Sequence, residues 1–229
     1  MPVTTIMPAT SAPIEIETAS NPTASIIWLH GLGADGHDFE TIIPELHLPP
    51  SLAVRFVFPH APYRPVSVNG GATMRAWYDI AFDASGIHQN EAHIRLSEQS
   101  LHALIAKEGE RGIDSRRIVL AGFSQGAAIA LHTGLRYHKS LAGIMALSTP
   151  LALAERIPAE LHAANAQVPV FLAHGTNDRV VPYAMGQVAH TLLQKIGVPV
   201  EWHSYPIEHT LSMEEVGDIR VWLERVLSA

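Results

Sequence analysis

Short apolar runs alternate with helix-like segments along most of this chain, and this alternation limits its fold more than any other feature. Six runs have the length and composition of buried strands: residues 25–29, 54–58, 118–121, 141–147, 170–173 and 200–204. Apolar residues at helical spacing mark segments at 90–110, directly after residue 126, at 183–195 and from 212 onward. The alternation predicts an α/β fold with a mostly parallel central sheet and helices on both faces.

The composition agrees with a sheet that is buried on both faces. Of the 229 residues, 47% are hydrophobic and only 16% are charged, which is typical of such a sheet. We expect a loosely ordered tail over residues 1–13 and one domain over residues 14–229. Only residues 148–169 separate two of the predicted strands, so no large cap domain is expected there.

Charge and cysteine content exclude several classes of function. The net charge is −7 and the 15 Lys and Arg residues are scattered, which argues against a nucleic-acid partner. No run approaches the roughly 18 apolar residues that cross a bilayer, so we expect a cytoplasmic protein without stable membrane insertion. Cysteine is absent, so any nucleophile must be an oxygen. The sequence leaves a homodimer open.

The sequence Gly122-Phe123-Ser124-Gln125-Gly126 lies between a predicted strand and a predicted helix. A G-x-S-x-G pattern in this context is typical of a nucleophile elbow, in which glycines allow a sharp turn that exposes the serine hydroxyl above the sheet. The pattern alone arises by chance in some chains, but its place between strand and helix favours the catalytic interpretation. Ser124 is therefore the candidate nucleophile.

A serine nucleophile needs a base, and the base needs an acid to orient it. Among 14 histidines, His209 lies in the loop between the last predicted strand and the last helix, at the sheet edge where functional loops gather. Asp178 lies in the turn that follows the strand before it. Ser124, Asp178 and His209 also occur in the chain order that this architecture uses.

Two backbone N–H groups are candidates for stabilising an oxyanion. In this architecture one donor belongs to the residue after the nucleophile, which is Gln125. The second comes from a loop after an early strand, and His30-Gly31-Leu32-Gly33 occupies that place. Its glycines permit close backbone approach, and we expect Leu32 to be the donor.

The same loop supports a rival hypothesis. Gly31, Gly33 and Gly36 match the G-x-G-x-x-G pattern of dinucleotide-binding proteins. However, no acidic residue occurs in residues 51–62, where the ribose-binding carboxylate is expected. A metal hydrolase is also disfavoured, because the chain has no H-E-x-x-H motif. We expect neither cofactor nor metal.

With these motifs in hand, the chain resembles the carboxylesterase and acyl-protein thioesterase family of α/β-hydrolases. The resemblance runs from about Ser25 to the C-terminus, through the segments 29–36, 59–62, 77–79 and 122–126, His174-Gly175 with Asp178, and His209. It implies cofactor-free hydrolysis of a small acyl ester, thioester or lysophospholipid by Ser124, Asp178 and His209. It also implies that Trp77 forms a wall of the acyl pocket, and we take Gly33 and Val181 as further substrate-binding candidates.

Two questions stay open at this point. A hydrolase fold can also serve as a non-catalytic ligand-binding module, because fold alone does not assign function. The segment 59–71 is rich in proline and glycine, so we expect it to lack regular structure. Whether this loop covers the site or is a plain connection is not decided by the sequence.

Overall fold

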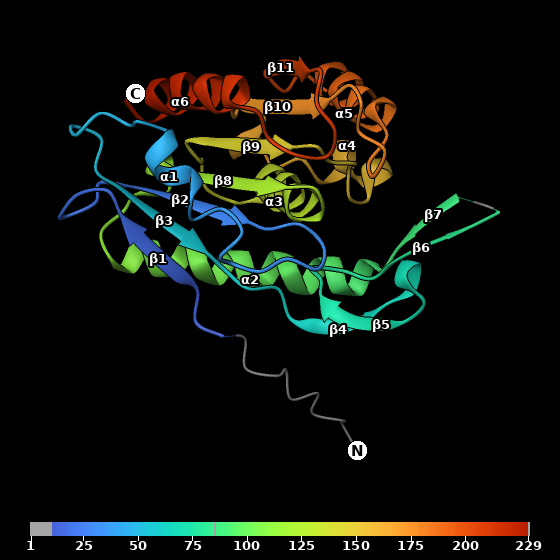
Figure 1. Ribbon diagram of the computed structural model, residues 1–229. Helices are drawn as coiled ribbons and strands as arrows, with labels where there is room; N and C mark the ends of the chain where they lie inside the picture. The colour runs from blue at the N-terminus through green and yellow to red at the C-terminus, as the bar shows by residue number, and fades with distance from the viewer. Residues whose placement is uncertain (1–10, 85, 229) are drawn as a thin grey trace.

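A seven-stranded sheet lies at the centre of the computed structural model, which describes residues 11–84 and 86–228 (Figure 1). The strand order is β1-β3-β2-β8-β9-β10-β11, with β1 Ile14–Glu17, β2 Ala24–Leu29, β3 Val54–Phe58, β8 Ile118–Phe123, β9 Gly143–Leu147, β10 Val170–Gly175 and β11 Val200–Tyr205. All neighbouring pairs are parallel except β1 with β3. The six predicted strands are confirmed, whereas the edge strand β1 was not predicted.

Helices cover both faces of this sheet, as predicted. The main helices are α2 Glu91–Glu110, α3 Gln125–Arg136, α5 Tyr183–Lys195 and α6 Met213–Ser228, and the short ones are α1 Ile42–Glu45 and α4 Ile157–Glu160. Strand side chains alternate between two buried clusters. Ile27 and Leu29 of β2 pack with α2, α3 and α5, whereas Ile26 and Trp28 pack on the α6 side. The predicted α/β architecture is therefore confirmed.

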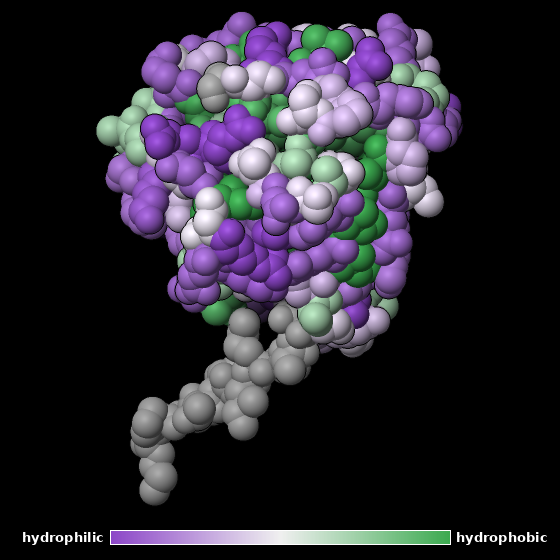
Figure 2. All heavy atoms as spheres, turned by 90° about the vertical axis from the view of Figure 1, so that its left-hand side faces the viewer, coloured by the Kyte–Doolittle hydropathy of each residue, from purple (hydrophilic) through white to green (hydrophobic). Residues whose placement is uncertain are grey.

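No large cap domain interrupts the described part of the chain. The segment between β9 and β10 contains only α4 and two 3₁₀ turns, Ala154–Arg156 and Ala163–Asn165. The carboxyl ends of the parallel strands consequently remain available to loops, on the right-hand side of Figure 1. The opposite edge, which faces the viewer in Figure 2, is covered mostly by hydrophilic side chains.

The expectation that residues 59–71 lack regular structure was wrong. This segment contains β4 (Tyr63–Val66), which pairs with β5 (Ala72–Arg75), and a 3₁₀ turn at Ser67–Asn69. Pro65 is tolerated in β4 because a two-stranded ribbon leaves one side of each strand without ladder hydrogen bonds. A second hairpin, β6 (Ile80–Asp83) with β7 (Gly86–Gln89), projects from the body of the molecule (Figure 1).

Two predictions concern the ends and the environment of the chain. Of the tail predicted over residues 1–13, residues 1–10 lie outside the described residues, so the division into a tail and one domain stays a prediction. Among the described residues, no helix is both long enough and apolar enough to cross a membrane.

Candidate active site

Ser124 occupies a sharp turn between β8 and α3 in a backbone conformation that is unusual for a non-glycine residue. Its φ is 54° and its ψ is −123°, a combination that costs energy and commonly marks a functional site. The two flanking glycines are required by space. A Cβ on Gly122 would lie 2.5 Å from the backbone N of Ala127, and one on Gly126 would lie 2.5 Å from the carbonyl oxygens of Leu29 and His30. The predicted elbow is therefore present.

Asp178 and His209 meet at the carboxyl end of the sheet. Asp178 follows β10 and His209 follows β11, and Nδ1 of the histidine lies 2.6 Å from Oδ2 of the aspartate. The other carboxylate oxygen, Oδ1, accepts the backbone N–H groups of Val180 and Val181, each at 2.8 Å. A carboxylate can only accept hydrogen bonds, so in a pair with an Asp178 carboxylate it is Nδ1 of His209 that carries the proton and donates. Nε2 is then left with its lone pair.

Backbone contacts hold the loops of Asp178 and His209 together. The N–H of Thr176 donates to Tyr205 O at 2.8 Å, and the N–H of Asn177 donates to Ile207 O at 3.0 Å. Gly175 lies at the crossing point, where an added Cβ would be 2.4 Å from the carbonyl oxygen of Glu208. Glycine at this position therefore allows the two loops to approach closely enough for the hydrogen bond between His209 and Asp178.

His209 also lies next to the nucleophile elbow. Its ring centroid is 4.6 Å from that of Phe123, the residue before Ser124. The described residues contain no hydrogen bond between Ser124 and His209, as is common before a substrate is bound. The side chain of His209 is 16% exposed and that of Asp178 is fully buried, so the base is accessible and its acid is shielded from water.

The loop after β2 runs alongside Ser124, as predicted for an oxyanion site. A Cβ added to Gly31 would lie 3.5 Å from the Cβ of Ser124. Within the described residues, the backbone N–H groups of Leu32 and Gln125 donate to no other group. The N–H of Gln125 is in the first turn of α3, where helix geometry leaves it without an internal acceptor. Both predicted donors are thus available to a ligand.

A buried hydrogen-bond network, which sequence reasoning missed, joins these two segments. The side chain of Gln125 accepts from the N–H of Trp77 and donates to the carbonyl oxygen of Tyr78, both at 2.8 Å. Trp77 Nε1 in turn donates to His30 O at 2.9 Å. Trp77 therefore links Gln125, the residue after the nucleophile, to His30 at the start of the predicted oxyanion loop. The motif residues were visible in the sequence, but their partners are set by the fold.

His30 is held in a single neutral form by this network. Its Nε2 accepts the N–H of Ala61 at 3.0 Å, so the proton is on Nδ1, which lies 2.7 Å from Gly31 O and donates to it. Burial disfavours the imidazolium and lowers the pKa of His30 to about 4. The ring therefore stays uncharged near neutral pH and braces the backbone of the loop.

The three substrate-binding candidates lie in different surroundings. Trp77 is 2% exposed, and its ring packs beside that of His30, with centroids 5.2 Å apart. Gly33 is exposed, has a φ of 82° and donates its N–H to Arg75 O. Val181 is 9% exposed and is bonded through its backbone to both Asp178 and His174. Their substrate contacts stay predictions.

His174 is a buried, uncharged residue that lies next to Asp178. Its Nε2 donates to Val181 O at 2.8 Å and lies 3.5 Å from Asp178 Oδ2. Burial lowers the pKa of His174, because the surroundings disfavour the charged ring. His174 is therefore a neutral neighbour of Asp178 and not a counter-charge for it.

Gly36, the last glycine of the rival dinucleotide motif, has a packing role here. A Cβ on Gly36 would lie 2.7 Å from the carbonyl oxygen of Phe58, and the N–H of Gly36 donates to His60 Nδ1 at 3.0 Å. Close packing against the end of β3 therefore accounts for this glycine. No group of three or more potential metal ligands occurs among the residues that the structure describes.

Comparisons with known proteins found similar sequences and structures over most of the chain. A model of the phospholipase/carboxylesterase family matches residues 12–227. Acyl-protein thioesterase 1 of Gibberella zeae is 37% identical over 225 residues, covering 94% of this chain and 96% of the relative. The crystal structure of Arabidopsis thaliana SOBER1 is similar with a TM-score of 0.82 at 32% identity, over 89% of this chain and 99% of that chain. Zea mays acyl-protein thioesterase 2 has a TM-score of 0.81 at 26% identity, over 93% and 99%.

Proposed function

The chain belongs to the phospholipase/carboxylesterase family, and we propose that it hydrolyses carboxylic esters or thioesters through an acyl-enzyme formed on Ser124. The family membership agrees with the resemblance inferred from the motifs. The observation that carries the proposal is the 2.6 Å hydrogen bond between His209 and a buried Asp178, beside a serine held in a strained elbow. The catalytic residues are Ser124, His209 and Asp178.

The reaction begins when Ser124 Oγ attacks the carbonyl carbon of the substrate. Nε2 of His209 takes the hydroxyl proton, so that a C–O bond forms and the carbonyl oxygen becomes an oxyanion. When this tetrahedral species collapses, the bond to the leaving oxygen or sulfur breaks and His209 returns the proton to it. A water molecule, deprotonated by the same histidine, then attacks the acyl carbon. As the bond to Ser124 Oγ breaks, His209 gives this proton to Oγ, and the carboxylic acid is released.

Asp178 stabilises the imidazolium that forms on His209 during both steps. Its Oδ1 is already occupied by two backbone N–H groups, so Oδ2 is directed at Nδ1 and fixes the tautomer in which Nε2 is basic. Burial of the carboxylate strengthens this interaction, because the surrounding medium is less polarisable than water. The acid therefore needs no movement as charge develops on the base.

The N–H groups of Leu32 and Gln125 stabilise the oxyanion in this proposal. Each such donor contributes roughly 3 kcal/mol to the transition state in well-studied hydrolases. The network through Gln125, Trp77 and His30 supports this role, because it connects the two donor-bearing segments through buried hydrogen bonds. Preorganised donors avoid the reorganisation that water would require.

The substrate side is proposed more coarsely. Relatives named acyl-protein thioesterase support an acyl thioester as a substrate class. We propose carboxylic esters of short to medium acyl chain length and lysophospholipids as further classes. We propose that Trp77, Gly33 and Val181 contribute to the substrate pocket. The cytoplasmic location and the homodimer stay predictions.

Replacing the nucleophile tests the proposal directly. We expect Ser124→Ala to reduce the hydrolysis of p-nitrophenyl butyrate by several orders of magnitude, while Ser140→Ala, at an exposed serine, retains full activity. A serine-directed phosphonate should add once to the wild-type protein and not to Ser124→Ala, as measured by intact mass. Comparable turnover by Ser124→Ala would refute the proposal. A wild-type protein that binds ester but neither hydrolyses it nor reacts with the phosphonate would favour the non-catalytic module.

A further inference from the structure

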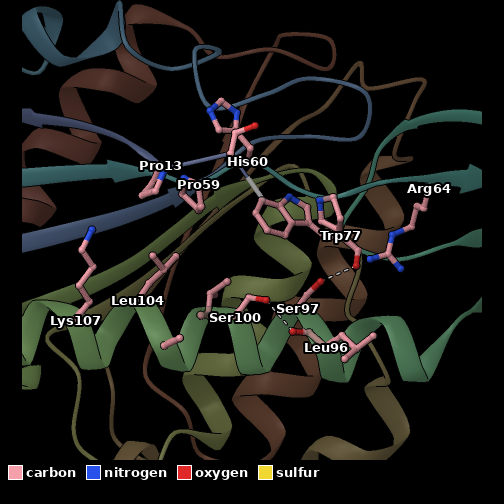
Figure 3. A pocket seen from close by; sticks show the side chains of 14 residues that line it. Pro13, Pro59, His60, Arg64, Trp77, Leu96, Ser97, Ser100, Leu104 and Lys107 are labelled. Atoms are coloured by element: carbon pink, nitrogen blue, oxygen red, sulfur yellow. Dashed lines mark hydrogen bonds between the residues drawn. The ribbon is translucent and has the colours of Figure 1, made fainter. Parts of the chain in front are cut away.

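A cavity that is not lined by Ser124 lies between α2 and the segment 59–64 (Figure 3). Its volume is about 310 Å³, at the lower end of the range for small-molecule sites. Trp77 lies between its two ends, and Leu104 of α2 lies across the cavity from Pro59 (Figure 3). Leu96, Leu101 and Pro62 also line it. These side chains give the cavity, which we call the α2 groove, a largely apolar lining.

The two ends of the α2 groove carry cations. Arg64 lies at one end and Lys107 at the other (Figure 3). Lys107 is paired with Glu15 at 2.8 Å, so its charge is already compensated. The guanidinium of Arg64, by contrast, has no hydrogen bond or salt bridge within the described residues, and its Nε is buried without a partner. An unpaired guanidinium beside apolar walls is a costly arrangement unless an anion completes it.

No carboxylate forms a salt bridge with Arg64 within the described residues. Asp79 is the acidic residue that acts on Arg64 electrostatically, but its two carboxylate oxygens accept the N–H and the hydroxyl of Ser67 at 2.7 and 2.8 Å. His60 adds a further donor to the groove. Its Nδ1 accepts the N–H of Gly36, so the neutral ring carries its proton on Nε2. The charge and hydrogen-bonding pattern of the groove is therefore that of an anion receptor with an apolar extension.

We propose that the α2 groove binds the carboxylate of a medium-chain fatty acid at Arg64, with the alkyl chain along the partly exposed Leu96 and Leu104 of α2. The planar guanidinium can hold both carboxylate oxygens, and the apolar walls favour a saturated chain over a sugar or a nucleotide. The volume suits a short chain of the octanoate class. The groove shares Trp77 with the proposed substrate pocket but includes none of Ser124, Asp178 and His209, so binding there does not require hydrolysis.

Octanoate and a photoreactive octanoate that carries a diazirine are the probes. Wild-type protein is first treated with a serine-directed phosphonate to occupy the elbow, with the modification checked by mass. We expect the probe to label peptides from α2 or from the segment 59–64. Titration calorimetry should show that octanoate binds at least tenfold more tightly than 1-octanol, which is matched in chain length but uncharged. If the phosphonate does not react, the proposed function fails while the labelling experiment remains valid.

Variants then test the role of the guanidinium. Arg64→Gln should weaken octanoate binding about tenfold, as expected for the loss of one charged hydrogen-bonding group, and Arg64→Lys should restore part of it. Arg220→Gln, at a partly exposed arginine of α6 that pairs with Glu224 and does not line the groove, is the matched control and should bind as the wild type does. Thermal melts check that each variant is folded. Labels confined to peptides that carry Ser124 or His209, equal affinity for octanol, absence of binding, or a folded Arg64→Gln with unchanged affinity would each overturn the proposal.

Discussion

Replacing Gln125 by glutamate should make the stability of the protein depend on pH in a defined way. The Gln125 side chain is 5% exposed and makes two hydrogen bonds of opposite sense, one accepted from Trp77 N–H and one donated to Tyr78 O. A protonated glutamate can make both bonds, because its carbonyl oxygen accepts and its hydroxyl donates. An ionised glutamate loses the donor and places a charge in a buried site.

The magnitude follows from these two losses. Burial and the missing donor should raise the pKa of the introduced carboxyl by about 2–3 units above its usual value of about 4.3. The folded state of the variant then binds more protons than the unfolded state. Below pH 4.3 the variant should be nearly as stable as the wild type. Above that pH its free energy of unfolding falls, relative to the wild type, by about 1.4 kcal/mol per pH unit. The deficit levels off at about 3–4 kcal/mol once the carboxyl is ionised in the folded state.

Urea unfolding followed by tryptophan fluorescence, at pH 5.0, 6.0, 7.0 and 8.0, measures this deficit. The comparison is the difference between variant and wild type at each pH, so that other titrating groups cancel. Gln125→Met is the matched control: it leaves the Trp77 N–H and the Tyr78 carbonyl unpaired at every pH, at about 1–3 kcal/mol each, and its deficit should be independent of pH. A glutamate variant whose deficit is equal at pH 5.0 and 8.0 would show that the buried network has been misassigned.

Three further changes probe the nucleophile elbow, the acid Asp178 and a buried glutamate of α6. Gly126→Ala should prevent formation of a native elbow, since its Cβ would lie 2.5 Å from two carbonyl oxygens; retention of wild-type melting temperature and esterase rate would contradict this. Asp178→Asn keeps the shape of the side chain but loses the charge opposite His209, and kcat should fall by about 10³–10⁴ with little change in the urea midpoint; a loss smaller than tenfold would count against the role of the acid. Burial raises the pKa of Glu215 to about 8, so this residue removes stability as the pH rises from about 4.5 to 8, and Glu215→Gln should be more stable than wild type at pH 8 but not at pH 4.5. Equal pH dependence of the two proteins in urea unfolding would refute that assignment.

Much of the architecture could be predicted from local sequence patterns. Apolar runs of strand length that alternate with helical spacing identified the six parallel strands and the four long helices. They could be identified because a strand buried on both faces consists mostly of apolar residues. The elements that were missed leave weaker traces. The edge strand β1 is short and half exposed, and β4 contains Pro65, which argues against a strand unless the ribbon has a side without ladder bonds.

By itself, the sequence determined the chemistry that this protein has available: a serine in a turn that only flanking glycines permit, a histidine and an aspartate after the last two strands, and no cysteine. Only the tertiary structure decided that Asp178 and His209 lie 2.6 Å apart, since this depends on the close crossing of two loops at Gly175. It also decided the hydrogen-bond partners of Gln125 and His30, and it left the Nε of Arg64 buried without a partner among the described residues. Hydrogen bonds between residues 30 or more positions apart leave no periodic pattern, because their geometry is set by packing rather than by the local backbone.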